Sequence, residues 1–367
     1  MLPLAVVFLI SAVAALIATP LVRRLALRFG AIDRPSDRKV HPKPTPTLGG
    51  LSLWLACMVG LGVAALLPAF EGLFDVSSEP LGVVMAGTVL VALGSYDDVR
   101  GLSVPAKVAG QVLAGGLLIL NGVQLFYVWF PGLGVLSLGG DLAVPLTLIW
   151  VLAMINAVNL IDGLDGLAAG VVVIAALAFF VYALEAGKPL FAGPSPASLF
   201  CVVVAGAAVG FLPYNFNPAR IFMGDSGSML LGLMLAAATI SGVGRTTTPT
   251  STDLAALAIP VAIPLLVLAV PFTDVLWAIA RRLRRGRPVY APDKEHIHHR
   301  LLEIGHSHRQ AVLLMYLWSA LIASSALAIT FIQSRAVTGL MLALIAAVLV
   351  GTAVPRMMRR ANGRVRP

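Results

Sequence analysis

Runs of about twenty apolar residues recur along nearly the whole chain, and this repetition limits its fold more than any other feature. Hydrophobic residues make up 59% of the 367 residues and charged residues only 12%, whereas a soluble domain carries about twice that charged fraction. A helical run of about twenty apolar residues is long enough to cross the hydrocarbon core of a bilayer. The sequence therefore predicts an all-α polytopic membrane protein, folded as a single domain over residues 1–367.

The apolar runs predict about eleven transmembrane helices, with boundaries good to a few residues. The first run is too long for a typical signal peptide, and its basic residues follow it, so we expect an uncleaved membrane helix. Pro260, Pro264 and Pro271 predict a kinked or broken ninth span. The predicted spans are 3–22, 49–67, 81–96, 105–121, 142–157, 166–185, 197–213, 227–243, 255–279, 311–332 and 336–354.

The basic residues predict the orientation of the spans. With the N-terminus outside, 23 of the 26 Lys and Arg residues fall in inside loops, and only Lys188, Arg245 and Arg335 fall outside. This distribution explains the net charge of +9 without nucleic-acid binding, because the positive charge is spread over the loops that set topology. The C-terminus is then cytoplasmic, and residues 356–367 form a basic cytoplasmic tail.

The acidic and amide side chains gather at the inner ends of the spans. Six of the 17 acids are scattered over outside loops, while the others lie inside, in short Gly-rich segments. These segments contain no thiols, because Cys57 and Cys201 both fall inside apolar runs. The cytoplasmic segments in which we expect the active site are 33–50, 96–107, 156–166, 214–228 and 280–301.

Carboxylates and amides of this kind are ligands that suit Mg²⁺, with Mn²⁺ as the alternative ion. Gly163 and Gly224 allow the backbone to approach a ligand closely. Lys43, Lys107 and Arg282 supply positive charge for phosphate oxygens. Together these groups predict phosphoryl transfer with a nucleotide-linked or lipid-linked phosphate at the membrane surface.

Simpler structural explanations exist for several of these residues. Asp97 and Asp98 precede Gly101 and could lie in a solvated loop or cap a helix, and Asp225 could cap the eighth span. The turn over residues 156–166 is harder to explain in this way, because its carboxylates and amides have no basic residue nearby.

The histidines also allow two interpretations. His296, His298 and His299 could bind zinc, but their spacing does not suit tetrahedral coordination and no cysteine is near. We interpret these three as candidates for binding a sugar and a diphosphate, and His306 and His308 as surface residues.

In this order along the chain, the segments resemble those of the polyprenyl-phosphate N-acetylhexosamine-1-phosphate transferase family. The resemblance extends from Asp33 to about Leu301. The histidine segment is similar to the branch that transfers GlcNAc-1-phosphate to undecaprenyl phosphate, although residues 285–290 depart from the Gly-Arg-Ser-Pro-Phe common in that branch. The shared motifs are Thr45-Pro46-Thr47-Leu48-Gly49-Gly50, Asp97-Asp98, the turn with Asn159, Asp162 and Asp165, and Phe222-Met223-Gly224-Asp225.

The resemblance implies that UDP-GlcNAc and undecaprenyl phosphate react to give UMP and a lipid-linked pyrophosphoryl sugar, which initiates a cell-envelope polysaccharide. One of Asp97 and Asp98 should face the lipid phosphate while the other braces it, and we favour Asp97 at the phosphate. Its role would be proton removal or charge positioning rather than formation of a covalent intermediate. The implied catalytic residues are Asp97, Asp98 and Asp162, the metal ligands are Asp225 and Asn159, and the substrate-binding residues are Lys43, Lys107, Asn156, Asp165, Arg282, His296, His298 and His299.

Two other functions stay open at this point. A sister transferase would use another UDP-aminosugar, including the peptidoglycan precursor. A secondary transporter would place ionisable residues near mid-bilayer on broken helices, whereas the acids here lie at inner span ends. The expected location is a bacterial inner membrane, with UDP-GlcNAc, undecaprenyl phosphate and membrane lipid as partners, no nucleic acid, and a homodimer left open.

The charge distribution predicts the outcome of a topology experiment. A reporter fused after Arg366 should behave as cytoplasmic, and a reporter placed near Asp141 as external, because 23 of 26 basic residues lie on one side. An accessibility assay on both fusions in cells tests this, and a cytoplasmic signal near Asp141 would show that the predicted number of spans is wrong.

Overall fold

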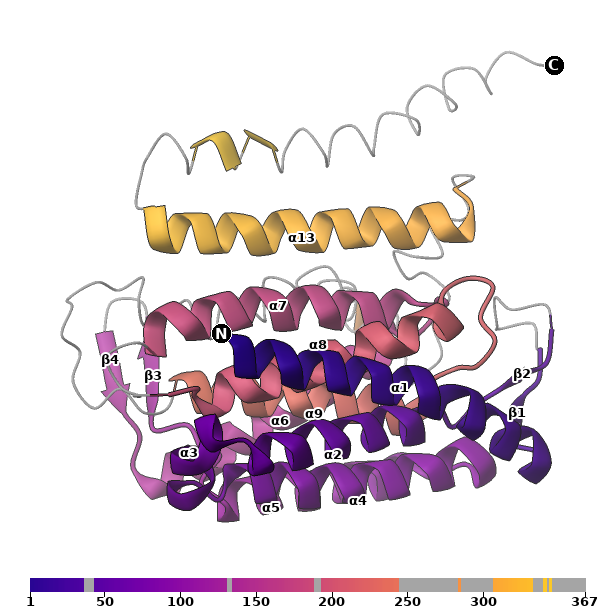
Figure 1. The fold of residues 1–367 in the computed structure, drawn as a ribbon, viewed down its shortest axis with the longest axis horizontal. Coiled ribbons are helices and arrows are strands. Elements are labelled where there is room, and N and C mark those ends of the chain that lie inside the picture. The colour runs from indigo at the N-terminus through magenta and orange to yellow at the C-terminus, as the bar shows by residue number, and fades with distance from the viewer. Residues whose placement is uncertain are drawn as a thin grey trace.

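The computed structural model describes residues 1–35, 43–130, 134–187, 193–243, 283–284, 306–332, 339–341 and 343–344, and the structural statements below refer to these residues. Long helices make up almost all of this part of the chain (Figure 1). They are α1 (Leu2–Phe29), α2 (Gly49–Leu66), α4 (Glu79–Arg100), α5 (Val104–Leu120), α6 (Gly140–Ile161), α7 (Leu167–Gly187), α8 (Pro196–Asn215), α9 (Gly224–Val243) and α13 (His308–Ile332).

The positions of these helices agree with the predicted spans to within a few residues at most ends. By length and composition, α1, α2, α4, α6, α7, α8 and α13 are long and apolar enough to cross a membrane, and α5 is a shorter apolar helix. The all-α membrane class is therefore confirmed for the described residues. The predicted span at 255–279 and most of 336–354 lie outside them, so the number of crossings and the orientation stay predictions.

Helix α9 lies at the centre of the bundle. It packs against α2, α4, α6, α7 and α8, and residues 226–241 are all buried. The Trp150 indole of α6 donates a hydrogen bond to the Thr239 hydroxyl of α9 at 2.9 Å, which satisfies both groups inside the bundle. The first turn of a helix leaves its amides without partners inside the helix, so a helix packed in this way needs acceptors from neighbouring protein.

Small elements mark the two ends of the bundle (Figure 1). At one end, β1 (Ile32–Asp33) pairs antiparallel with β2 (Thr45–Pro46). At the other end, the short helices η1 (Pro68–Phe70) and α3 (Glu71–Val76) precede α4. The hairpin of β3 (Tyr127–Phe130) and β4 (Gly134–Ser137) lies at that same end, between α5 and α6.

Backbone hydrogen bonds join the β2 segment to the start of α9. The Phe222 amide donates to the Pro46 carbonyl at 2.9 Å, and the Gly49 and Gly50 amides donate to the carbonyls of Phe222 and Met223 at 3.0 and 2.9 Å. Two segments that the sequence separates by more than 170 residues therefore lie side by side. This places the 33–50 and 214–228 segments at the same end of the bundle.

Helix α4 approaches α9 closely at Gly94. A Cβ atom at this position would lie 2.8 Å from the backbone carbon of Asp225 and would also overlap the backbone of Ser226. We expect Gly94→Ala to separate the two helices and to lower the free energy of unfolding by about 1–3 kcal/mol, as overpacking of a close interface does. The thermal midpoint of the purified protein in detergent measures this effect.

Gly116→Ala in α5 is the matched control, since a Cβ atom there meets nothing within 4 Å. It should leave the midpoint nearly unchanged. Equal midpoints for the two variants would contradict the close approach of α4 to α9.

Candidate functional site

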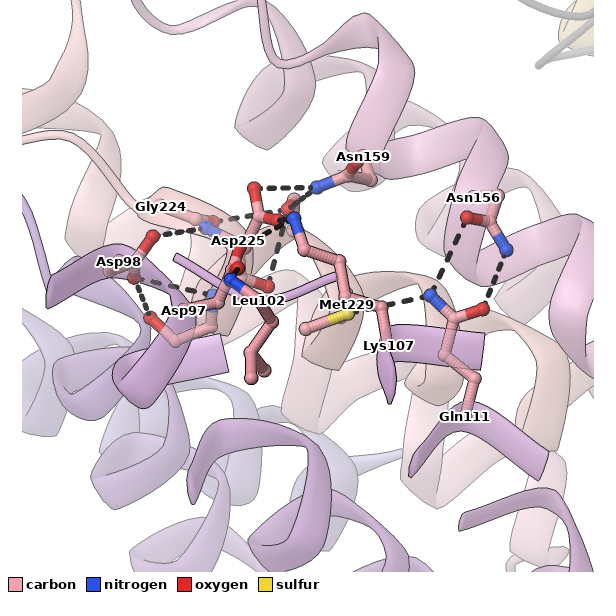
Figure 2. A network of polar contacts seen from close by, with 12 residues as sticks. Asp97, Asp98, Leu102, Lys107, Gln111, Asn156, Asn159, Gly224, Asp225 and Met229 are labelled. Atoms are coloured by element: carbon pink, nitrogen blue, oxygen red, sulfur yellow. Dashed lines mark hydrogen bonds and ion pairs between the residues drawn. The ribbon is translucent and has the colours of Figure 1, made fainter. Parts of the chain in front are cut away.

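Four aspartates come together at the end of the bundle where α4 and α6 end and α9 begins. Asp97 and Asp98 lie in the last turn of α4, Asp162 follows α6, and Asp225 is the second residue of α9. We call these four residues the acid cluster. Figure 2 shows Asp97, Asp98 and Asp225 in one network of polar contacts with Lys107 and Asn159.

Asp98 holds the first turn of α9. Its Oδ1 accepts a hydrogen bond from the Asp225 amide at 2.8 Å, and its Oδ2 accepts from the Ser226 hydroxyl at 2.9 Å and from the Ser226 amide at 3.4 Å. The carboxylate thus acts as an N-cap supplied by another helix, and its negative charge favours the positive end of the α9 dipole. Asp98 therefore stabilises the start of α9. Which of Asp97 and Asp98 contacts a lipid phosphate stays a prediction.

Gly224 permits this arrangement. Its φ of +69° lies in the left-handed region, and a Cβ atom there would lie 2.6 Å from Cγ of the Asp98 carboxylate. Any side chain at this position would therefore meet both backbone strain and a steric clash.

Lys107 lies between the other two network carboxylates. Its Nζ is 2.5 Å from Oδ2 of Asp97 and 2.6 Å from Oδ2 of Asp225. The second oxygen of Asp97 accepts a hydrogen bond from the Leu102 amide at 2.5 Å, which orients the carboxylate from its own loop. One ammonium group thus neutralises carboxylates from α4 and α9 at once.

Asn159 extends the network toward α6. Its Nδ2 donates to Oδ1 of Asp225 at 3.0 Å and to the Ser228 hydroxyl at 2.9 Å. Within the described part of the chain, its amide oxygen accepts no hydrogen bond. Asn159 and Asp225, which we expected to share a metal, therefore lie side by side.

Asp162 has a different environment from the other members of the acid cluster. Its carboxylate forms no hydrogen bond or ion pair with any residue that the structure describes. Burial raises the pKa of Asp162 well above its usual range, and the negative charges of Asp225, Asp98 and Asp165 raise this pKa further. A cation bound beside the cluster would lower the pKa of Asp162 and favour its charged form.

The acid cluster has the donor chemistry of a Mg²⁺ site. Among the described residues, one ammonium group pairs with two of the four carboxylates, those of Asp97 and Asp225. The oxygens of Asn159 and Asp162 that have no partner among these residues are hard donors. No three acidic or His/Cys side chains in this part of the chain converge as a complete cation cage. That pattern fits Mg²⁺, which commonly binds through one or two carboxylates while substrate phosphates complete its coordination.

The turn after α6 is held by the loop between α8 and α9. Oδ2 of Asp165 accepts hydrogen bonds from the Asn217 side chain at 2.9 Å and from the Ala219 amide at 3.0 Å. The Gly166 amide donates to the Asn215 side chain at 3.2 Å. The Asn215-Phe216-Asn217 segment, to which no specific role was assigned from its pattern, thus holds the Asp165 turn in place.

His308 was expected on the surface, and that expectation is wrong. The residue is partly buried, and its Nε2 accepts a hydrogen bond from the Asp165 amide at 3.0 Å. The contact joins residues 143 positions apart, so local sequence could not reveal it. A usable signal was the capping box of Ser307 and Gln310, which places His308 in the first turn of a helix.

The remaining predicted residues are placed as follows. The Asn156 side chain pairs with Gln111, with its Nδ2 at 2.8 Å from Oε1 of Gln111, and it lies apart from the acid cluster in Figure 2. Lys43 is exposed just before β2. The predicted residues outside the described part of the chain are Arg282, His296, His298 and His299.

The capping role of Asp98 predicts the effect of its removal. Asp98→Ala should lower the free energy of unfolding by about 1–3 kcal/mol, because the first amides of a buried helix lose their acceptor. Asp98→Asn keeps one acceptor oxygen, so its loss of unfolding free energy should be smaller than that of Asp98→Ala. Ser226→Ala removes only the hydroxyl contact and should lower the unfolding free energy least. Thermal midpoints test this order, and a stable Asp98→Ala variant would contradict the cap.

Comparison with known proteins identifies the family of the chain. Residues 80–243, which include the whole acid cluster, match the model for Glycosyl transferase family 4. The chain is 42% identical to the decaprenyl-phosphate N-acetylglucosaminephosphotransferase of Mycobacterium leprae over 98% of this chain and 92% of that protein. It is 30% identical to the undecaprenyl-phosphate alpha-N-acetylglucosaminyl 1-phosphate transferase of Escherichia coli over 82% of this chain and 77% of that protein. The chain therefore belongs to the polyprenyl-phosphate N-acetylhexosamine-1-phosphate transferase family of integral membrane proteins.

Proposed function

We propose that this protein transfers GlcNAc-1-phosphate from UDP-GlcNAc to a polyprenyl phosphate on the cytoplasmic face of a bacterial membrane. The observation that carries the proposal is the acid cluster, a group of four aspartates in which, among the described residues, the Lys107 ammonium pairs only with Asp97 and Asp225. Such an excess of negative charge calls for a cation, and a Mg²⁺–diphosphate donor supplies one. The relatives' names support the sugar and the lipid class.

The reaction is a displacement at phosphorus. A phosphate oxygen of the lipid attacks the β-phosphorus of UDP-GlcNAc, and the bond from that phosphorus to the oxygen of the α-phosphate breaks. UMP leaves, and the lipid carries the new pyrophosphate with its sugar. A phosphate monoester is already a competent nucleophile, so positioning and charge neutralisation can supply most of the catalysis.

Asp225 and Asn159 would hold Mg²⁺, which when bound neutralises charge on the attacked phosphorus and on the leaving UMP. Lys107, between Asp97 and Asp225, would contact a phosphate once substrate competes for its ammonium. Asp97 would face the lipid phosphate, because Asp98 is occupied as the cap of α9. Lys43 would hold phosphate as well.

The relatives of this chain are named for acceptors of two lengths. Relatives that are 42% identical are named for decaprenyl phosphate, and a relative that is 30% identical is named for undecaprenyl phosphate. The chemistry at the acid cluster is the same for both, since the two lipids share a phosphate head group.

Radiolabel transfer tests the function directly. Purified protein receives labelled UDP-GlcNAc or another UDP-aminosugar, with decaprenyl or undecaprenyl phosphate, in the presence and absence of Mg²⁺. We expect a labelled lipid and stoichiometric UMP only with UDP-GlcNAc and Mg²⁺. A labelled lipid with a different sugar would favour a sister transferase. Uptake of substrate into vesicles without a lipid product would favour a transporter.

The metal assignment predicts that Asp225→Asn nearly abolishes turnover and lowers the apparent affinity for Mg²⁺, because a neutral amide is a weaker ligand. Titration of activity with Mg²⁺ measures both effects. Asp141→Asn is the matched control, since this exposed acid begins α6 at the opposite end of the bundle. Near-normal activity of Asp225→Asn at low Mg²⁺ would overturn the assignment.

A further inference from the structure

Three side chains of α13 contact the backbone at the acid-cluster end of the bundle. His308 accepts a hydrogen bond from the Asp165 amide at 3.0 Å, and Arg309 donates from Nε to the Asn217 carbonyl at 2.9 Å. Tyr316 donates its hydroxyl hydrogen to the Gly166 carbonyl. Elsewhere among the described helices, α13 packs mainly against α7 (Figure 1).

These contacts complete the support of the turn that carries Asp162. The loop before α9 already binds the Asp165 carboxylate and the Gly166 amide. Two other polar groups of these residues, the Asp165 amide and the Gly166 carbonyl, form hydrogen bonds with side chains of α13. The turn is therefore held from two sides by elements far away in sequence, and its Asp162 carboxylate has no partner among the described residues.

The start of α13 is itself fixed in register. The Ser307 amide donates to the Gln310 side chain at 2.9 Å, and the Gln310 amide donates to the Ser307 hydroxyl at 3.3 Å, as in a capping box. This places His308 and Arg309 in the first helical turn. Gly170 of α7 leaves the space for the Tyr316 ring, because a Cβ atom there would overlap the ring.

We propose that His308 is a positioning residue of the transferase site, which acts through the Asp165 amide to hold the Asp162 turn against the acid cluster. This inference rests on the proposed function. An acceptor nitrogen is essential to it, so His308 binds as a neutral imidazole with its proton on Nδ1. Arg309 and Tyr316 support the same turn from the same helix.

The kinetic test compares His308→Ala with His308→Gln, whose side-chain oxygen can replace Nε2 as the acceptor. His308→Ala should lower kcat/KM for UDP-GlcNAc by about tenfold, through loss of one positioning hydrogen bond. The KM for polyprenyl phosphate should stay unchanged, because Asp97 and Lys107 are not on this turn. His308→Gln should restore most of the loss.

The control is Gln310→Ala, which weakens the capping box but leaves the His308 imidazole in place. It should lower the thermal midpoint without a selective loss of kcat/KM for UDP-GlcNAc. If His308→Ala behaves like Gln310→Ala, or if His308→Gln fails to restore activity, the positioning role is wrong.

Amide hydrogen exchange gives a readout that does not depend on turnover. Exchange in peptides covering residues 162–166 should rise in His308→Ala, return toward the wild-type level in His308→Gln, and stay low in Gln310→Ala. If His308→Ala does not fold, Tyr316→Phe removes only one hydroxyl and should raise exchange in the same peptides. Unchanged exchange in these variants overturns the inference, whereas failure of the wild-type protein to transfer GlcNAc-1-phosphate overturns the proposed function instead.

Discussion

The hydrogen bonds from the first turn of α9 to the Asp98 carboxylate determine the geometry of everything at this end of the bundle. Five of the described helices pack against α9, and the helix is buried from Ser226 onward, so its first amides need acceptors from neighbouring protein. A carboxylate from α4 takes that place and complements the helix dipole. The same bond fixes the distance between α4 and α9, and with it the gap between Asp97 and Asp225 that the Lys107 ammonium occupies.

The acid cluster also shows how stability and ligand binding are linked here. Carboxylates held close together in a partly buried site are costly unless positive charge or hydrogen bonds compensate them. Asp98 is compensated by amides, and Asp97 and Asp225 share Lys107, but Asp162 has no such partner among the described residues. A site in this state gains more from binding a cation and a phosphorylated ligand than a neutral pocket would.

The positions of the helices follow from hydropathy, because a membrane span must be long, apolar and internally hydrogen-bonded. The site was predictable only in part. Asp97 and Asp98 are adjacent in sequence, and only their different partners, Lys107 and the start of α9, separate their positions. Asn156 pairs with Gln111, a single amide within an apolar run that gave no signal of its own. The contact of His308 spans too great a sequence separation for local patterns to report.

The contacts of α13 also bear on how the protein is made. A chain that has been synthesised only as far as α9 already contains all four acids, Lys107 and Asn159. It still lacks the partners of the Asp165 amide and the Gly166 carbonyl, which arrive with residues 308 and 316. The ribosome therefore has to pass the start of α13 before the turn at Asp162 is fully supported, so maturation of the site comes late in biosynthesis, after the helices that carry its acids are complete.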